Sequence, residues 1–302
     1  YSAKSFMIAF GLSAIYLVLS WIVVGYKADQ LVLVGLFNSM YFLGVTTRKF
    51  IVAFSVFIVY WVIFDYMKAI PNYRFHSVHI KSLFIAEKNL FGINSPQGTL
   101  TPNEYLSIHA KPWLDIATGF FYLCWVPLPL VFAGILFFKS RKHYFYFALT
   151  FLLVNIIGFI GYYIYPAAPP WYVQQYGFEF HAGIPGNTAG LHRFDDFFHV
   201  PIFSSIYAKS SNVFAAMPSL HAAYPLLVLF YGIKYRFGLW NFLFGTITLG
   251  IWFAAVYNYH HYVLDVLAGI FCGILGISIS EILLARTNNG RMLMDHLFSS
   301  IE

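Results

Sequence analysis

The chain has 302 residues, of which 60% are hydrophobic and 10% charged, against about 45–50% and about 25% in an average soluble domain. A soluble fold has too little interior to bury that much apolar surface. Aromatic residues make up 21% of the chain, which suits side chains that face lipid tails and headgroups. The composition predicts an integral membrane protein.

The formal net charge is +6, and a basic chain raises the question of nucleic acid. Here the basic residues form short clusters between apolar stretches, as topology signals do, and we exclude nucleic acid as a partner. Cys124 and Cys272 lie in apolar runs without the spacing of a redox or metal site. We expect both cysteines to pack in the core or face lipid.

Apolar stretches of the length that crosses a bilayer recur along the chain and predict an all-α, polytopic helix bundle with about eight transmembrane helices. The expected spans are 5–26, 31–46, 50–67, 115–138, 144–165, 212–233, 238–257 and 260–284. The second of them is short for a span.

Two long polar segments interrupt these spans, at 68–114 and 166–210, and both contain several prolines. The first is expected to be an extracytoplasmic loop with an interfacial helix around 78–92. The predicted organisation is four segments. They are the N-terminal spans 1–67, the loop 68–114, a catalytic transmembrane core 115–284 that includes the loop 166–210, and a cytoplasmic tail 285–302.

Lysine and arginine in the short connections indicate the orientation, because cytoplasmic loops retain positive charge. With eight spans the basic clusters all fall on one side, which we interpret as the cytoplasm. They are Lys4, Arg48 with Lys49, the turn 139–142, Lys234 with Arg236, and Arg286 with Arg291. Both long loops then lie on the periplasmic or lumenal face. Short termini and compact loops favour a bacterial inner membrane over a Golgi membrane.

His261 and Asp265 are the strongest candidates for chemistry on that outer face, since ionisable groups near membrane depth default to a functional interpretation. Four residues apart, they share one helix face. The carboxylate can fix the imidazole tautomer and leave the other ring nitrogen free as a nucleophile. The alternative is a pair that only caps or packs a helix entrance.

Ser219 and His221 follow Pro218 at the predicted start of a span. Free backbone N–H groups at a helix start favour an anion, the serine hydroxyl adds a donor, and His221 can protonate a leaving oxygen. The alternative is a capping serine and an interfacial histidine.

A phosphorus centre needs cations for its equatorial oxygens, and Arg193 is the best candidate because guanidinium matches phosphate bidentately. The alternative for Arg193 is an ion pair with Asp195 or Asp196. The His and Asp residues lack zinc-ligand spacing, and we predict catalysis without a metal or other cofactor.

Four motifs in this order resemble a known family. They are Pro-Ala-Ala-Pro-Pro-Trp-Tyr at 166–172, Gly-Leu-x-Arg-x-Asp at 190–195, Pro-Ser-Leu-His at 218–221 and His-His-Tyr-x-x-Asp at 260–265. The last two resemble motifs of the type-2 phosphatidic acid phosphatase superfamily, although Ala255 stands where that superfamily has an arginine. The full set is similar to one branch, the aureobasidin-sensitive inositol phosphorylceramide synthases.

The resemblance implies a six-helix catalytic core behind two additional N-terminal spans. It implies His261 as nucleophile, Asp265 as its partner and His221 as general acid and then base, with Arg193 in place of the missing superfamily cations. Inositol phosphate would pass from phosphatidylinositol to ceramide through a phosphohistidine, with release of diacylglycerol. The residues expected to bind substrate are Arg193, Ser219, His260, Gly190, Asp195, Trp171, Tyr172 and Tyr262.

Two other functions are weighed. A lipid phosphatase of the same superfamily would use the same residues with water as acceptor; Trp171, Tyr172, Phe197 and Phe198 could form an apolar wall against water, or serve as interface anchors. A transporter with a His and Asp relay would distribute polar residues along several spans and show inverted repeats, and the sequence has neither. An accessory subunit leaves no trace in the sequence.

Overall fold

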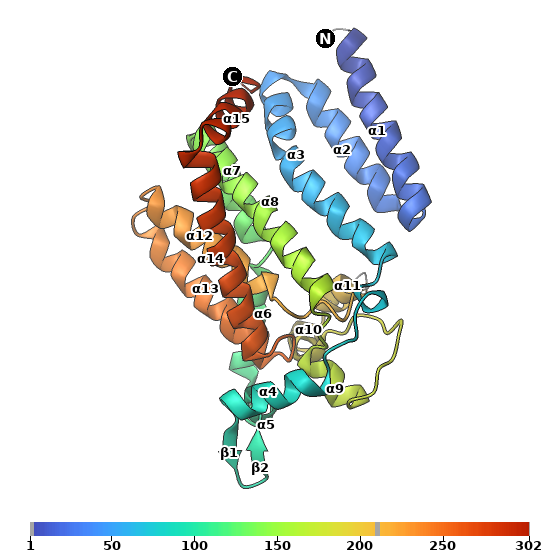
Figure 1. The fold of residues 1–302 in the computed structure, drawn as a ribbon, viewed down its shortest axis with the longest axis vertical. Helices are drawn as coiled ribbons and strands as arrows, with labels where there is room; N and C mark the ends of the chain where they lie inside the picture. The colour runs from blue at the N-terminus through green and yellow to red at the C-terminus, as the bar shows by residue number, and fades with distance from the viewer. Residues whose placement is uncertain (1–2, 209–211, 302) are drawn as a thin grey trace.

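The structure, a computed structural model, describes residues 3–208 and 212–301. The last two residues of the predicted loop 166–210 lie outside them. The described chain is nearly all helical (Figure 1). The α-helices are α1 (Ala3–Val24), α2 (Ala28–Leu43), α3 (Val45–Tyr66), α4 (Lys81–Phe91), α5 (Pro102–Ile108), α6 (Pro112–Leu123), α7 (Pro127–Lys139), α8 (Arg141–Ile164), α9 (Pro170–Tyr176), α10 (His192–Phe198), α11 (Ile202–Tyr207), α12 (Leu220–Lys234), α13 (Trp240–Tyr257), α14 (Val263–Arg286) and α15 (Asn288–Ser299).

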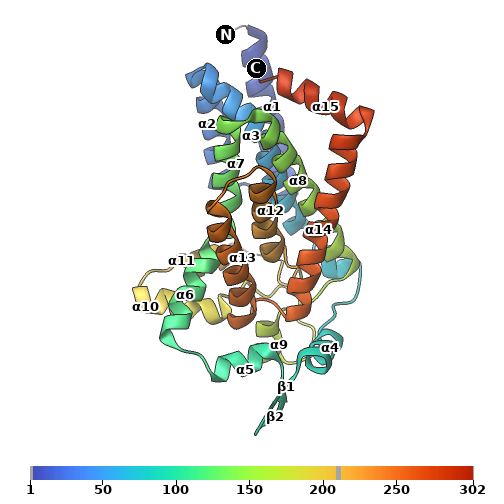
Figure 2. The same ribbon diagram turned by 90° about the vertical axis from the view of Figure 1, so that its left-hand side faces the viewer.

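Short elements complete the described chain. They are the 3-10 turns η1 (Met67–Ala69), η2 (Asn72–Arg74) and η3 (Ala189–Leu191), and the strands β1 (Ile93–Ser95) and β2 (Gly98–Leu100). The two strands pair antiparallel as a hairpin, with Ile93 opposite Leu100. This hairpin projects from the end of the molecule that lies away from both termini (Figures 1 and 2).

The all-α membrane fold is confirmed. Within the described residues, 5 helices are long and apolar enough to cross a membrane, or up to 6 if the bent pair α6 and α7 is one span. Two of the predicted spans correspond to shorter apolar helices, α2 with 16 residues and α12 with 15. The count of eight transmembrane helices therefore stays a prediction.

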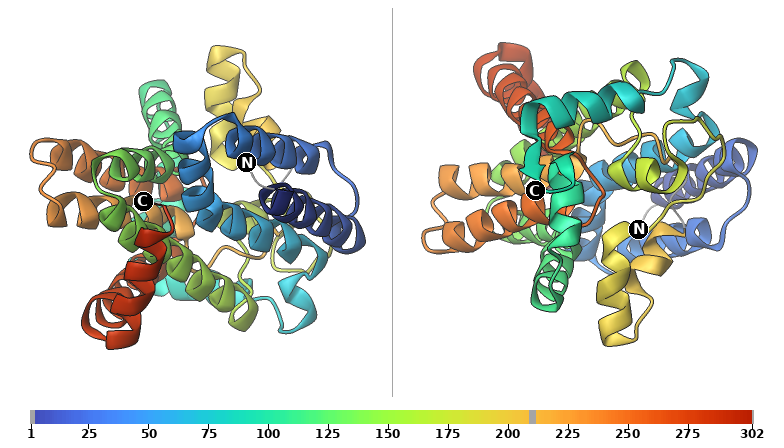
Figure 3. Two further views of the ribbon diagram at one scale, coloured as in Figure 1. Left: turned by 90° about the horizontal axis from the view of Figure 1, so that it is seen from above. Right: turned by 90° about the horizontal axis from the view of Figure 1, so that it is seen from below.

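The three N-terminal helices form a group on one flank of the molecule (Figure 3). Among them α3 joins the group to the rest by packing on α8. Large apolar side chains of α1 such as Met7, Trp21 and Ile22 are exposed, which suits contact with lipid.

Helices α6 and α7 are bent by 42° at the break between them. Pro127 opens α7, and because proline has no backbone N–H the hydrogen-bond ladder of α6 cannot continue through it. The bend places Trp125 against the ring of His221, with 4.4 Å between ring centroids.

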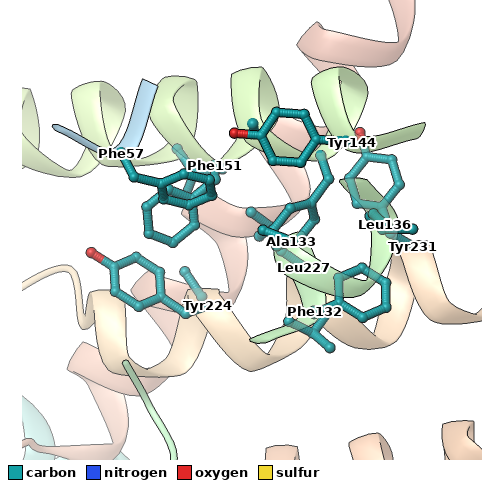
Figure 4. Close-up of a cluster of buried hydrophobic side chains, with 14 of the residues drawn as sticks. Phe57, Phe132, Ala133, Leu136, Tyr144, Phe151, Tyr224, Leu227 and Tyr231 are labelled. Atoms are coloured by element: carbon teal, nitrogen blue, oxygen red, sulfur yellow. The ribbon is translucent and has the colours of Figure 1, made fainter. Parts of the chain in front are cut away.

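The main apolar core lies between α7, α8 and α12, with α3 beside them, and is rich in aromatic rings such as Phe132, Phe151 and Tyr224 (Figure 4). Some buried hydroxyl groups in it are paired with each other: the Oγ1 of Thr150 lies 2.6 Å from the hydroxyl of Tyr231. Pairing matters because water cannot satisfy polar groups at this depth.

Glycines let α8 and α14 approach the start of α12. A Cβ on Gly269 of α14 would lie 2.0 Å from the backbone oxygen of Ser219, and one on Gly158 of α8 would lie 2.6 Å from Leu220. The backbone N–H of Ser219 donates to the carbonyl of Asp265 over 2.9 Å. The two segments that carry Ser219 and Asp265 are therefore in direct backbone contact.

The polar segments gather at the end away from both termini (Figures 1 and 2). Isolated bridges join His79 to Ala167 and Ala167 to Ala215, so the two long loops and the segment before α12 form one layer. The helix predicted around 78–92 is observed as α4, and its interfacial position stays a prediction. The tail predicted from 285 onwards contains α15, which packs on α8 and α14 and buries Met294.

A substitution of Gly269 by Ala tests the close contact. The added methyl group would push α14 from Ser219, and such overpacking costs about 1–3 kcal/mol. We expect a lower unfolding temperature in detergent together with lower turnover. Gly245→Ala in α13 is the control, because nothing lies within 4 Å of its Cβ position. Equal stability of the two variants would contradict the contact.

Candidate active site

His221 and His261 face each other at the outer end of the bundle. The Nδ1 atom of His221 lies 2.9 Å from the Nε2 atom of His261; His261 is buried, and His221 is partly buried. His221 is in the first turn of α12, and His261 lies in the junction between α13 and α14. Two motifs 40 residues apart therefore meet through their histidine rings.

The junction is held by tight backbone bonds. The N–H groups of His260 and His261 both donate to the carbonyl of Ala255, over 3.1 and 3.0 Å, and Tyr259 adopts a left-handed conformation. Ala255 is fully buried, with no exposed surface. The position that carries an arginine in the wider superfamily is thus a packing position in this chain.

Asp265 lies beside His261 as expected, but the two are not hydrogen-bonded. The Oδ2 atom of Asp265 is 3.6 Å from the Nδ1 atom of His261 and accepts the N–H of Tyr262 over 2.8 Å. The Nδ1 atom of His261 and the Oδ1 atom of Asp265 are buried without a partner. Catalytic hydrogen bonds are often long in ligand-free enzymes and shorten when substrate binds.

Ser219 is the N-cap residue of α12, yet its side chain makes no capping bond. Its hydroxyl is fully buried and has no hydrogen-bond partner. Buried polar atoms in native proteins are nearly always paired, so an unpaired hydroxyl beside a helix start is a candidate ligand contact. The alternative of a simple capping serine receives no support from this geometry.

Arg193 pairs with a residue that the sequence did not suggest. Its Nε atom donates to the Oδ1 atom of Asp115 over 2.7 Å, and its guanidinium lies 5.2 Å from the ring centroid of Tyr257. The Tyr257 hydroxyl donates to the same Asp115 oxygen over 2.7 Å. The expected alternatives, ion pairs with Asp195 or Asp196, are wrong.

One nitrogen of Arg193 is left available. Its Nη2 atom is buried without a partner and lies near Gly190, where a Cβ would be 3.0 Å away. Gly190 also donates its N–H to the carbonyl of Asn258 over 3.0 Å. A larger residue at this position would collide with both Asn258 and Arg193, so the glycine keeps the guanidinium beside the His260–His261 junction.

Asp195 organises the loop that carries Arg193. Its two carboxylate oxygens accept the N–H groups of Phe203 and Ser204 at the start of α11, and the Ser204 hydroxyl donates as well. Such bonds satisfy N–H groups that a helix start leaves free. The substrate-binding role predicted for Asp195 stays a prediction, and the contacts favour positioning of the loop.

The remaining predicted binding residues surround the junction. His260 lies between the rings of Tyr207 and Tyr122, at 4.6 and 5.3 Å, and its Nε2 atom is 2.9 Å from the Thr188 carbonyl oxygen. Tyr262 is buried, and its hydroxyl is unpaired. His260 and Tyr262 flank His261 in the chain, and both side chains are buried.

Trp171 and Tyr172 are buried in the layer of loops. The N–H of Trp171 donates to the carbonyl of Tyr259 over 3.1 Å, and the Tyr172 hydroxyl donates to the carbonyl of Glu179 over 2.6 Å. Their contacts hold loops together, whereas Phe197 and Phe198 are exposed. Within the described chain, no three His, Cys, Asp or Glu side chains are grouped to hold a metal ion.

Three polar residues near the site were not predicted to take part in it. Glu87 and Asn103 come from the first loop and bond to the backbone around His261, and Asp115 holds Arg193. In the sequence, Glu87 lies in the predicted interfacial helix and Asp115 at the start of a predicted span, and neither position alone indicates a role in the site. Their partners lie far along the chain, and local spacing does not encode such contacts.

The fold and this cluster define a class of protein. The sequence profile of the PAP2 superfamily matches residues 100–279, which include both histidines, Arg193 and Asp265. The chain belongs to this superfamily.

Comparison with individual proteins shows which members of the superfamily the chain is similar to. The chain is 43% identical to phosphoinositol dihydroceramide synthase of Bacteroides thetaiotaomicron, and the alignment covers 100% of this chain and 99% of that protein. It is 27% identical to inositol phosphorylceramide synthase of Candida albicans, over 77% of this chain and 48% of the relative. The catalytic subunit of that synthase in Schizosaccharomyces pombe is 28% identical, over 76% and 53%. No solved structure matches the chain.

Asp115→Asn tests the support of Arg193. The amide keeps one acceptor but loses the charge, and charge-assisted bonds are about twice as strong as neutral ones. We expect kcat/KM for the phospholipid donor to fall by about tenfold, which corresponds to about 1.4 kcal/mol. Asp196→Asn, at an exposed position, is the control. Unchanged kinetics in Asp115→Asn would remove Asp115 from the site.

Proposed function

We propose that the protein is a sphingolipid headgroup transferase that moves inositol phosphate from phosphatidylinositol to ceramide or dihydroceramide. The observation that carries the chemistry is the pair of histidine rings, 2.9 Å apart, beside Asp265. Arg193, whose Nη2 atom has no partner, comes from the loop in which Gly190 bonds to Asn258 at the same junction. The full-length relative from Bacteroides thetaiotaomicron supports the substrate class.

In the first step, Nε2 of His261 attacks the phosphorus atom and the bond from phosphorus to the glycerol oxygen breaks. Diacylglycerol leaves with a proton from His221, and a phosphohistidine remains. The two rings part to admit the phosphorus between them, so that attacking nitrogen and departing oxygen lie on opposite sides. Asp265 approaches Nδ1 of His261 and stabilises the positive charge that develops on the ring.

In the second step, His221 takes the proton of the ceramide hydroxyl, whose oxygen attacks phosphorus as the nitrogen–phosphorus bond breaks. Free His261 and inositol phosphorylceramide result. Arg193 and the hydroxyl of Ser219 contact the non-bridging phosphate oxygens in both steps, because both present unpaired donor atoms. Dividing one displacement into two lets a single phosphate site serve donor and acceptor.

The transferase is favoured over a phosphatase by the relatives, which are named as synthases. The rings of Tyr122 and Trp125 pack on His221, and His261 itself is buried. Both features also favour the transferase, because a site that excludes water disfavours hydrolysis of the phosphohistidine.

The site faces the outer side of a membrane in this proposal. The basic turn 139–142 lies at the far end of α12 from His221, since Lys139 lies over the ring of Phe237 just after that helix ends; by the positive-inside rule it marks the cytoplasm. We place the protein in a bacterial inner membrane, with the pair at the periplasmic face. The segments 1–67, 68–114, 115–284 and 285–302 remain the proposed organisation, although the superfamily match already begins at residue 100.

The test is an assay of purified protein with labelled phosphatidylinositol, with and without ceramide, in the presence of a chelator. The expected products are inositol phosphorylceramide and diacylglycerol, formed only with ceramide. Water-soluble phosphate or inositol phosphate formed regardless of ceramide would instead establish the phosphatase. Loss of all turnover in chelator would contradict metal-independent catalysis.

His261→Ala is expected to abolish both turnover and covalent labelling of the protein by the donor, because it removes the attacking nitrogen. His221→Ala should permit slow labelling but little transfer to ceramide. Acid quenching and mass spectrometry detect the labelled peptide. His181→Ala, at an exposed position of the second loop, is the control. Full activity in His261→Ala would refute the mechanism.

A further inference from the structure

We propose that Glu87 and Asn103, two buried residues of the first extracytoplasmic loop, are positioning residues that hold the backbone of His261 and Asp265 in register for catalysis. The inference rests on the proposed function for its catalytic part only. Its structural part, a clamp from this loop onto the start of α14, follows from hydrogen bonds alone.

Glu87 caps α14 from a different part of the chain. Its Oε1 and Oε2 atoms accept the N–H groups of Val263 and Leu264 over 2.9 and 3.1 Å, although 176 and 177 residues separate the partners. A helix start leaves its first N–H groups unsatisfied, and the N-cap residue here, Tyr262, makes no side-chain capping bond. Glu87 supplies the missing acceptor with both oxygens.

The burial of Glu87 is unusual for a carboxylate. Its side chain has no exposed surface, and desolvation raises its pKa to about 7, while the two backbone bonds oppose that rise. A buried acid is expensive unless it is well hydrogen-bonded, and perturbed acids concentrate at functional sites. A buried glutamate that only filled space would lower the stability of the fold, so its burial indicates a role for its two hydrogen bonds.

Asn103 holds the other side of the same junction. Its Nδ2 atom donates to the carbonyl of Val256 over 2.7 Å and to the carbonyl of His261 over 2.9 Å. One amide group therefore joins the end of α13 to the backbone of His261. Asn103 is 1% exposed, so water does not replace these bonds.

The clamp leaves the catalytic carboxylate available. Asp265 is the third residue of α14, a position from which an aspartate can turn back to cap its own helix. Because Glu87 occupies the N–H groups of Val263 and Leu264, the carboxylate of Asp265 bonds only to the N–H of Tyr262 and keeps its Oδ1 atom unpaired. Without Glu87, we expect Asp265 to move toward the free N–H groups and away from His261.

The first measurement is hydrogen exchange of the α14 amides in the full-length protein in detergent micelles, which needs no turnover. In Glu87→Ala, the amide hydrogens of Val263 and Leu264 should exchange at least about tenfold faster than in the wild type, because their acceptor is gone. Glu87→Gln, with one acceptor oxygen left, should fall between Glu87→Ala and the wild type. Unchanged exchange in both variants would overturn the clamp, whatever the reaction proves to be.

The second measurement is ceramide-dependent transfer by the same variants. Glu87→Ala and Asn103→Ala should lower kcat by about tenfold or more, since small misplacements of reacting groups have effects of this size, while KM for phosphatidylinositol changes less than about twofold. Glu87→Gln should recover part of kcat. Exposed Glu179→Gln and Asn94→Ala are the matched controls.

The outcomes separate positioning from plain stability. A fall in kcat at unchanged KM, with an unfolding temperature close to that of the wild type in Glu87→Gln, supports the proposal. Loss of activity that only follows loss of folded protein, or wild-type kcat in both alanine variants, overturns it. A third outcome is possible: amide exchange is faster in Glu87→Ala, but the wild-type protein makes no sphingolipid. That result would support the clamp and reject the proposed function.

Discussion

The site depends on the backbone contact between the start of α12 and the start of α14. The N–H of Ser219 donates to the carbonyl of Asp265, and Gly269 has no Cβ to prevent the approach. This contact places a serine hydroxyl, two histidines and a carboxylate from different helices at one point. In a bilayer such a contact is durable, because no water competes for the backbone groups.

Around that contact, polar groups fall into two kinds. The carboxylate oxygens of Asp195 and Glu87 accept backbone N–H groups, and the amide nitrogen of Asn103 donates to two backbone carbonyls, so all three fix loops and helix ends. Ser219 and Arg193 keep a buried donor without a partner. Fixed surroundings together with donors left free for a phosphate are the arrangement that electrostatic preorganisation requires.

The sequence was sufficient for the elements and for the pairing of motifs. Apolar runs located the helices. The spacing of His261 and Asp265 predicted that they lie close together, but the shared helix face is wrong, because His261 lies in the junction before α14 begins. The sequence could not identify the partner of Arg193, since Asp115 lies 78 residues away and Asp195 was nearer along the chain. It also placed the start of α12 too early, because residues 212–219 join the loop layer through Ala215 before the helix begins.

The close approach of His221 to His261 has a consequence for which lipids the enzyme can use. In the ligand-free protein each ring occupies space that phosphorus needs, so the pair must be separated before reaction. Only binding energy from the rest of the substrate can drive that separation. Acyl chains would therefore contribute to turnover itself rather than to affinity alone, and a water-soluble phosphodiester with the same headgroup would leave the two rings together.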